Sequence, residues 1–356
     1  MATWTKITKP LENGTPVQMQ APVIVSASRS TDIPAFYADW FFHRLQVGYS
    51  AWTNPFNGVK SYVCYDKTRF IVFWSKNPKP LLPYLHILKE RNINCYIQYT
   101  LNDYQAEGLE KVPSLEQRID TFKRLSERLG RESVIWRFDP LILAKGLTVD
   151  ALLEKIRNIG NLLKDHTEKL VFSFADIATY KKVENNLKAN NIPYQEWTGQ
   201  QMDEFASKLA VMNKQEKWNF QLATCGEKID IKQYGIDHNR CIDGDLIVRL
   251  AWKDPVLMDF MKVKIEDVPQ PTFFDPAPFL PEGAILLPQN HYFISRHKKD
   301  PGQRPLCGCM AAKDIGEYNT CPHLCEYCYA NTTKQLAIAN WKRHNENKFA
   351  ETITGK

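Results

Sequence analysis

The sequence predicts an α/β fold, a TIM-like (β/α) barrel, full or partial. From residue 23 to about residue 226, short apolar runs rich in β-branched and aromatic residues alternate with longer amphipathic stretches. This alternation is typical of βα units, in which each strand of a parallel sheet is followed by a helix. A second observation supports the barrel, because apolar runs end in polar residues, as in "SASRSTD", "FWSKNP", "WRFDP" and "ATCGE". The chain of 356 residues is long enough for one such barrel.

Each short apolar run is expected to be a strand of this sheet. The expected strands are Val23–Ser28, Phe70–Ser75, Cys95–Leu101, Val134–Phe138, Leu170–Phe174 and Phe220–Cys225. The amphipathic stretches between them are expected to be the helices Ala35–Gln46, Lys79–Arg91, Ser114–Leu129, Thr148–Lys164, Tyr180–Asn190 and Gly199–Lys217. Ser114 and Thr148 each supply a capping oxygen ahead of acidic residues, as helix N-termini prefer. Residues 49–66 are expected to insert a strand or hairpin, since Asn57-Gly58 is a turn signal.

The rest of the chain is expected to form separate parts around a barrel body that spans residues 23–250. Residues 1–22 form an N-terminal extension. Residues 251–300 are rich in Pro and lack periodicity over much of their length, so we expect a connector that wraps the body. Residues 301–356 carry a cysteine-rich segment that is expected to bind a metal cluster, followed by a final helix that completes the barrel.

The polar residues at the strand ends are the first candidates for chemistry. In a parallel barrel these ends open on one face, where active sites are built. A single such residue can also cap a helix or occupy a turn, but the repetition along the chain favours a shared mouth. The residues expected to act on a substrate there are Arg29, Asp32, Lys76, Arg137 and Asp139. Asn77, Asn102, Asp176, Cys225 and Glu227 follow the same pattern.

Composition limits the class of protein. Hydrophobic residues at 44% and charged residues at 24% are typical of a globular chain, not of a disordered or fibrous one. The net charge of +6 comes without a long basic run, so a nucleic-acid partner is possible but not favoured. No stretch approaches the roughly 20 apolar residues of a membrane span, so we expect no membrane partner and a cytoplasmic location. The cysteines are clustered near the C-terminus and do not resemble a secreted disulfide framework.

The spacing of Cys321, Cys325 and Cys328 in "CPHLCEYC" indicates a metal site. A short loop with this spacing can supply three thiolates to a [4Fe–4S] cluster, which leaves one iron without a protein ligand. An external chelating ligand can bind that iron and receive an electron. Zinc, with His323 or a thiol of "LCGC" as its fourth ligand, stays open as the alternative. A disulfide is not favoured, since the cytosol is reducing.

Four other thiols are candidates for a second site. Cys225 ends the last expected strand, Cys241 follows in a polar loop, and Cys307 and Cys309 flank a glycine. Together they could hold an auxiliary [4Fe–4S] cluster or a zinc ion. Equally, the first two could be ordinary buried residues and the other two free or structural thiols. The sequence leaves these readings open.

The run "CPHLCEYCYAN" resembles the cluster loop of the radical S-adenosylmethionine (SAM) superfamily, in which an aromatic residue such as Tyr327 precedes the third cysteine. Spore photoproduct lyase and its relatives have a similar run. The wider chain resembles a bacterial family catalogued as domain of unknown function 1848, through "SRSTDIPAFY", "NPFN", "FWSKNP", "ATCGE", "CIDGDLI" and the cysteine loop. The resemblance implies an enzyme in which a reduced [4Fe–4S] cluster cleaves SAM to a 5′-deoxyadenosyl radical that acts on an unknown substrate.

The resemblance also implies roles for residues near the cluster. Tyr327 would lie against the SAM adenine, Asp32 would bind its ammonium group, and Arg29 or Ser28 would bind its carboxylate. Asn331, at the end of the loop, is placed with the cofactor-binding residues. The superfamily's Gly-Gly-Glu motif is absent, and "SASRSTD" occupies its expected place. An external electron donor such as flavodoxin or ferredoxin is implied as a partner.

The position of the loop differs from most of the superfamily, where it follows the first strand. Here it follows all six expected strands, which a circularly permuted radical SAM barrel would explain. A helix over Thr332–His344, capped by Asn331 or Thr332, would then be the superfamily's first helix. Two alternatives to the enzyme stay open: a nucleic-acid-binding or repair factor with a structural iron–sulfur cluster, and a zinc-stabilised binding protein.

Overall fold

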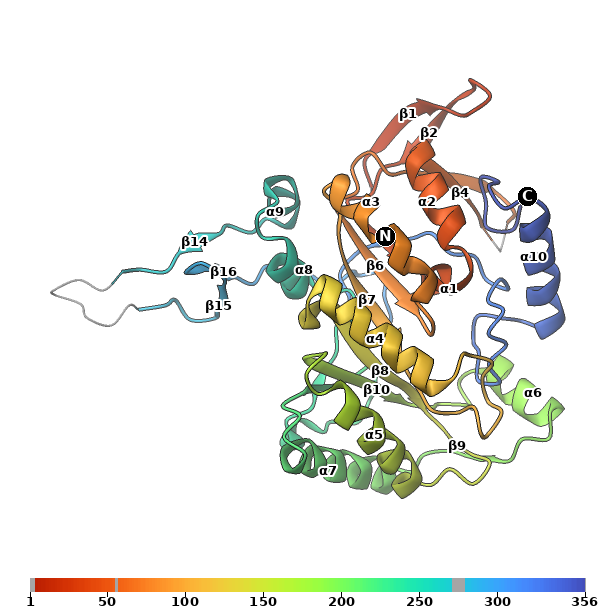
Figure 1. The fold of residues 1–356 in the computed structure, drawn as a ribbon, viewed down its shortest axis with the longest axis vertical. Coiled ribbons are helices and arrows are strands. Elements are labelled where there is room, and N and C mark those ends of the chain that lie inside the picture. Colours follow the sequence, from red (N-terminus) through yellow and green to blue (C-terminus); the bar gives the residue numbers. More distant parts are fainter. Residues whose placement is uncertain (1–3, 55–56, 271–278, 356) are drawn as a thin grey trace.

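The computed structural model describes residues 4–54, 57–270 and 279–355 and is organised around one large parallel sheet (Figure 1). The sheet has eight strands in the order β13-β12-β10-β8-β7-β6-β3-β17, and all neighbours in it run parallel. Its strands are β3 (Ile24–Ala27), β6 (Phe70–Ser75), β7 (Asn94–Thr100), β8 (Val134–Leu141), β10 (Lys169–Phe174), β12 (Gln221–Thr224), β13 (Asp237–His238) and β17 (Lys313–Asp314). The predicted α/β class and all six predicted strands are confirmed. Within the described residues no pairing joins β13 to β17, so a closed barrel is not shown.

The helices follow the strands as the alternation predicts. The helical elements between β3 and β12 are α1 (Ile33–Phe36), α2 (Ala38–Val47), the 3₁₀ helix η1 (Lys79–Tyr84), α3 (Leu85–Glu90), α4 (Leu115–Leu129), the 3₁₀ helix η2 (Arg131–Ser133), α5 (Val149–Leu163), α6 (Lys181–Ala189) and α7 (Gly199–Gln215). The two predicted caps are confirmed: the Ser114 side chain accepts from Gln117 N, and the Thr148 side chain accepts from Ala151 N. One predicted helix is split at Tyr37, whose backbone leaves the helical region at φ −129°.

The apolar strands are buried because both faces of the sheet are covered. Phe70, Ile71, Val72 and Phe73 of β6 are all fully buried, as expected for a parallel strand between two layers. One face packs against α1 to α7. The other packs against α8 (Gly244–Ala251) and α9 (Pro255–Met261), which the sequence analysis had not separated from the barrel body and the connector.

The N-terminal extension and the predicted hairpin form one small sheet. Strands β1 (Lys6–Pro10) and β2 (Pro16–Gln20) pair with β5 (Lys60–Cys64) and β4 (Tyr49–Thr53) in the order β1-β2-β5-β4. The antiparallel pairing of β4 with β5 confirms the hairpin predicted over residues 49–66. Two further short strands, β9 (Leu143–Ala144) and β11 (Tyr194–Gln195), pair with each other.

Residues 251–300, expected as a wrapping connector, carry α9 and a small antiparallel sheet. The sheet contains β14 (Glu266–Asp267), β16 (His291–Ile294) and β15 (Ala284–Leu287) in that order. In Figure 1 it extends away from the body as an arm. Part of the Pro-rich stretch, residues 271–278, lies outside the described residues.

The C-terminal segment returns to the large sheet. Strand β17 pairs with β3, with Lys313 opposite Val25 and Asp314 opposite Ser26. The cysteine loop follows, and then α10 (Lys334–Glu346), which confirms the predicted final helix. Its cap is Thr333, whose side chain accepts from Leu336 N, so the predicted cap at Asn331 or Thr332 is wrong by one or two residues. No helix among the described residues is long and apolar enough to cross a membrane.

Candidate functional site

The cysteine loop, residues 321–328, lies at the carboxyl ends of three neighbouring strands. His323 Nε2 is 2.8 Å from Oδ2 of Asp32, which follows β3. The Tyr327 hydroxyl accepts from Lys76 Nζ at 2.8 Å and from Asn102 Nδ2 at 3.2 Å. Lys76 follows β6 and Asn102 follows β7. The structure therefore brings the predicted residues Asp32 and Lys76 to the predicted cysteine loop.

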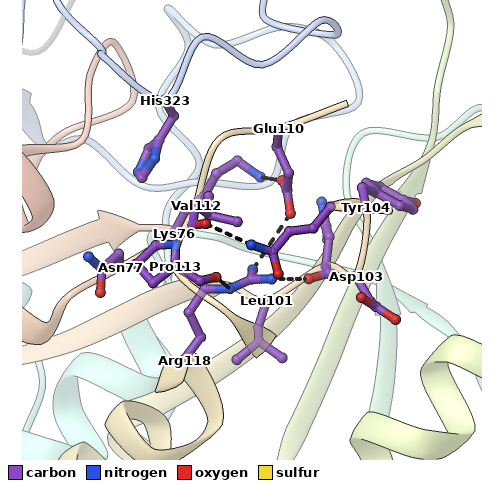
Figure 2. Close-up of polar contacts among 12 residues, drawn as sticks. Lys76, Asn77, Leu101, Asp103, Tyr104, Glu110, Val112, Pro113, Arg118 and His323 are labelled. Carbon is purple, nitrogen blue, oxygen red and sulfur yellow. Dashed lines mark hydrogen bonds and ion pairs between the residues drawn. The ribbon is translucent and has the colours of Figure 1, made fainter. Parts of the chain in front are cut away.

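A buried group of charges underlies the loop (Figure 2). The Glu110 carboxylate is 2.9 Å from Lys76 Nζ and 3.6 Å from Arg118 Nη1, and the side chains of Glu110 and Arg118 are fully buried. Glu110 also accepts from the Tyr327 hydroxyl. Burial by itself would raise the pKa of Glu110, but the charges of Lys76 and Arg118 outweigh it and hold that pKa below its ordinary value. The carboxylate is therefore ionised at neutral pH.

Neither Glu110 nor Arg118 was a candidate in the sequence analysis. Glu110 lies in the irregular stretch between β7 and α4, where a charged residue is ordinarily exposed. Arg118 is on the first turn of α4 and donates to the carbonyl oxygens of Asn102 and Pro113 (Figure 2). A local pattern contains no sign of these contacts, because they join segments that meet only in the folded chain.

Asp32 holds the loop and the strand ends together. Its carboxylate accepts from Ala35 N at 3.0 Å, from Lys76 N at 2.7 Å and from His323 Nε2 at 2.8 Å. The other ring nitrogen of His323 is 3.0 Å from the carbonyl oxygen of Lys111. The imidazole ring is therefore held between the Asp32 carboxylate and the Lys111 carbonyl oxygen. In this structure the contacts of Asp32 orient the loop, a role that the sequence analysis did not assign to it.

The segment that leads to the loop packs closely on Ser28. A Cβ atom added to Gly316 would lie 1.8 Å from the Ser28 hydroxyl oxygen, so only glycine permits this approach. Ser28 Oγ accepts from Ser30 N at 2.9 Å. Ser28 therefore lies against the segment that leads to the cysteine loop.

Among the described residues, no hydrogen bond joins two of the three thiols of the loop. Burial raises the pKa of Cys321, Cys325 and Cys328, that of Cys325 to about 12. Asn331 closes the loop, because its backbone N donates to Cys328 Sγ and its side chain donates to the Cys321 carbonyl oxygen. Three thiols in one short loop suit a ligand with several metal atoms.

The four other candidate thiols meet in a second group, which we call the four-thiol group (Cys225, Cys241, Cys307 and Cys309). Cys225 Sγ is 3.3 Å from Cys241 Sγ, and Ile242 N, next to Cys241 in the chain, donates to Cys309 Sγ at 3.3 Å, with Cys307 two residues away. These residues come from the end of β12, from the loop after β13 and from the segment before β17. The sequence-predicted set is therefore brought together in the fold.

The remaining predicted catalytic residues, Arg29, Arg137 and Asp139, lie near the four-thiol group, and Arg29 also borders the loop, because its carbonyl oxygen accepts from the Tyr329 hydroxyl at 2.7 Å. Arg137 Nη1 donates to Cys241 Sγ at 3.2 Å, and its Nη2 pairs with Asp139 Oδ2 at 2.6 Å. The guanidinium groups of Arg29 and Arg137 lie over the Trp74 ring, at 5.6 Å and 5.4 Å from its centroid. The single mouth expected from the sequence thus contains two separate thiol groups with different neighbours.

Glu227 lies near the four-thiol group and can exchange a proton. Its Oε1 accepts from Phe174 N at 2.9 Å, and burial raises the pKa of Glu227 to about 7. A carboxyl group with such a pKa can donate or accept a proton at neutral pH. The sequence analysis grouped Glu227 with the strand ends but gave it no role.

Neither thiol group is closed around a metal position as its side chains stand. Among residues 4–54, 57–270 and 279–355, no three His, Cys, Asp or Glu side chains are arranged to hold a metal ion. The donor chemistry of the loop nevertheless fits an iron–sulfur cluster, since three thiols from one short loop are its usual ligands.

Comparison with known proteins decides the family. A family model described as "Domain of unknown function (DUF1848)" matches residues 24–330. The chain belongs to the DUF1848 family. No curated protein and no solved structure matches the chain. The DUF1848 match confirms the membership predicted from the sequence blocks, and it spans both thiol groups, while β1, β2 and α10 lie outside it.

Proposed function

We propose that this DUF1848 protein is a radical SAM-type enzyme that acts on a substrate yet to be identified. The observation that carries the proposal is the place of β17. This strand lies parallel to β3 at the edge of the large sheet, and it is followed by the cysteine loop and then by α10. The resemblance implies a first strand, then the cluster loop, then a helix, with the first strand paired to the next strand of the sheet. The permuted order of these elements along the chain is therefore consistent with a radical SAM sheet.

The loop would hold the cluster through Cys321, Cys325 and Cys328, with SAM as the external ligand. When bound, the cluster would pass one electron to SAM, whose carbon–sulfur bond breaks to give methionine and a 5′-deoxyadenosyl radical that takes hydrogen from the substrate. An external one-electron donor, such as a flavodoxin or ferredoxin, restores the reduced state. All other tasks fall to the chain, which must hold the loop, orient the ligand and exclude water.

The structure contains groups suited to these tasks. Asp32 and His323 fix the start of the loop against β3 and β6. The Tyr327 hydroxyl is held by Lys76, Asn102 and Glu110, which sets the orientation of its ring at the end of the loop. Because burial keeps the three thiols protonated without metal, cluster binding would release their protons.

The test is formation of 5′-deoxyadenosine. Protein reconstituted with iron and sulfide without oxygen, reduced with dithionite and mixed with SAM should produce 5′-deoxyadenosine, and the Cys325→Ala variant should not. Reconstituted protein that contains about four iron atoms per chain and forms no 5′-deoxyadenosine would contradict the proposal. That result would instead favour a structural cluster in a binding protein.

A further inference from the structure

We propose that the four-thiol group is a second metal site, separate from the cysteine loop, that binds one Zn²⁺ ion. Its members are far apart in sequence, but the fold places them side by side. Cys241 and Cys309 are buried at 3% and 2% exposure, and Cys225 and Cys307 are partly buried. Cysteines without disulfides that converge from three segments are the usual ligands of structural zinc.

The distance between the sulfurs favours a single ion over a cluster. Around one tetrahedral zinc, with Zn–S bonds of about 2.3 Å, neighbouring sulfurs lie just under about 4 Å apart. Cys225 Sγ and Cys241 Sγ are 3.3 Å apart, and Cys309 Sγ lies 3.3 Å from the backbone N of Ile242, the residue after Cys241. In a [4Fe–4S] cluster each thiolate binds a different iron at the corner of a cube, so the sulfurs must stand well apart. The separation of Cys225 Sγ and Cys241 Sγ fits a shared zinc ion and is too short for two ligands of a [4Fe–4S] cluster.

The backbone around these thiols is already fixed. Cys225 N donates to the Phe172 carbonyl oxygen, and the carbonyl oxygen of Cys309 accepts from Asp300 N. Gly308 lets its segment pack closely on the residue before Cys241, since a Cβ atom there would lie 2.9 Å from Arg240 Cγ. Zinc binding would turn the cysteine side chains toward one centre from these fixed segments.

The polar neighbours complement a tetrathiolate ion. Four thiolates and one Zn²⁺ carry a net charge of −2. The Arg137 guanidinium contacts Cys241 Sγ and is shared with Asp139, while the Nη2 atom of buried Arg29 has no hydrogen-bond partner. Asn239 Nδ2 donates to Cys241 Sγ at 3.1 Å, and Ile242 N donates to Cys309 Sγ at 3.3 Å. Donors of this kind orient metal-bound thiolates and stabilise their charge.

The site would join the arm to the sheet. Cys307 and Cys309 follow β16 of the arm in the chain, whereas Cys225 follows β12 and Cys241 precedes α8. A zinc ion shared by these segments would stabilise the folded state, because the unfolded chain does not present the four ligands together. This inference does not rest on radical SAM chemistry and can fail or succeed without it.

The experiment measures zinc and iron in the same samples. The full chain is purified without oxygen from cells supplied with zinc, and both metals are quantified by mass spectrometry. We expect about one zinc per chain in the wild type, loss of zinc in the Cys307→Ser/Cys309→Ser variant, and unchanged iron in the loop. The control is Cys95→Ala, which removes a buried thiol outside both groups and should keep the zinc.

X-ray absorption at the zinc edge of the wild type keeps the proposal testable if the double variant does not fold. Four sulfur neighbours at about 2.3 Å are expected. Three outcomes would overturn the proposal: wild-type protein without zinc, zinc retained in a folded double variant, or additional iron and sulfide that depend on Cys307 and Cys309. A wild-type protein that binds zinc but no iron would count against the proposed function and would not contradict the zinc site.

Discussion

The thiols of the cysteine loop and those of the four-thiol group differ in the hydrogen bonds between their sulfurs and in the charges that surround them. Among the described residues no hydrogen bond joins two sulfurs of the loop, and a carboxylate, an imidazole and a lysine lie nearby. In the four-thiol group Cys225 Sγ and Cys241 Sγ are 3.3 Å apart, and arginines lie nearby. The same side chain therefore has two environments within one sheet.

The difference extends to protonation. Burial raises the pKa of Cys321, Cys325 and Cys328. In the other group, hydrogen bonds from Cys225 and Cys309, with the charge of Arg137, hold the pKa of Cys241 well below its ordinary value. The comparison teaches that spacing in the sequence alone does not decide what a thiol group can bind. The distances between the sulfurs and the charges around them decide what the group can bind, and substitutions can change the distances and the charges separately.

The largest effect is expected from Glu110→Gln, which acts on the loop side of the comparison. The substitution leaves Arg118 and Lys76 buried without their counter-charge, and breaking a buried ion pair in this way costs about 3–5 kcal/mol. Unfolding in urea should show the loss, and iron bound after reconstitution should fall. The matched control, Glu204→Gln, removes an exposed partner of Lys208 and should change neither quantity measurably.

Arg137→Gln should act on the four-thiol group. It removes the donor to Cys241 Sγ, and losing such an orienting partner typically lowers metal affinity about 10–100-fold. Zinc competition with a chelator measures this, and iron in the loop should be unchanged. Arg240→Gln, a change at a partly exposed arginine that pairs with Asp245, is the control. Equal zinc affinity in the Arg137 variant and the wild type would show that Arg137 does not support the site.

Asp32→Asn tests how the loop is held. An amide keeps one acceptor but places an NH₂ group against donors, so about 1–3 kcal/mol of stability should be lost. Asp254→Asn is the control, since Asp254 also caps a helix, α9, far along the chain from the loop. Both variants should unfold earlier in urea, but only Asp32→Asn should retain less iron. Equal iron in the two would mean that the loop does not depend on Asp32.

The smallest effect is a difference in the pH dependence of stability. The folded-state pKa of Glu110 lies below its unfolded value, so the unfolded chain binds more protons in between. The stabilisation is complete above the unfolded pKa of about 4.3 and is lost as the pH falls through the folded pKa. The gap in unfolding free energy between wild type and Glu110→Gln should therefore narrow as the pH falls below the unfolded pKa of about 4.3. A constant gap would contradict this sign.

The sequence predicted the sheet well because its strands are buried on both faces. Continuous apolar runs such as Phe70–Ser75 mark these strands directly, and β6 has the predicted bounds. It could not predict β17, because Lys313 and Asp314 have no strand pattern and are extended only through pairing with β3. The loop beyond β17 was nevertheless found, since three closely spaced cysteines are a local signal.

The candidate site, like the sheet, was predicted only in part. The seven cysteines and their division into a loop and a second group were predicted from type and spacing, but all the polar strand ends were assigned to one shared mouth. Asp32 and Lys76 contact the loop and Arg137 contacts the four-thiol group, a division that depends on contacts of the folded chain. Glu110 was missed because its partners come from three separate segments.

The most direct test of the central claim is electron paramagnetic resonance of the reduced protein with and without SAM. The account holds that the cysteine loop leaves one iron open to an external ligand. It predicts that SAM shifts the spectrum of the reduced cluster, that the shift is absent in Cys325→Ala, and that it persists in Cys307→Ser/Cys309→Ser. A reduced four-iron cluster whose spectrum is the same with and without SAM would contradict it.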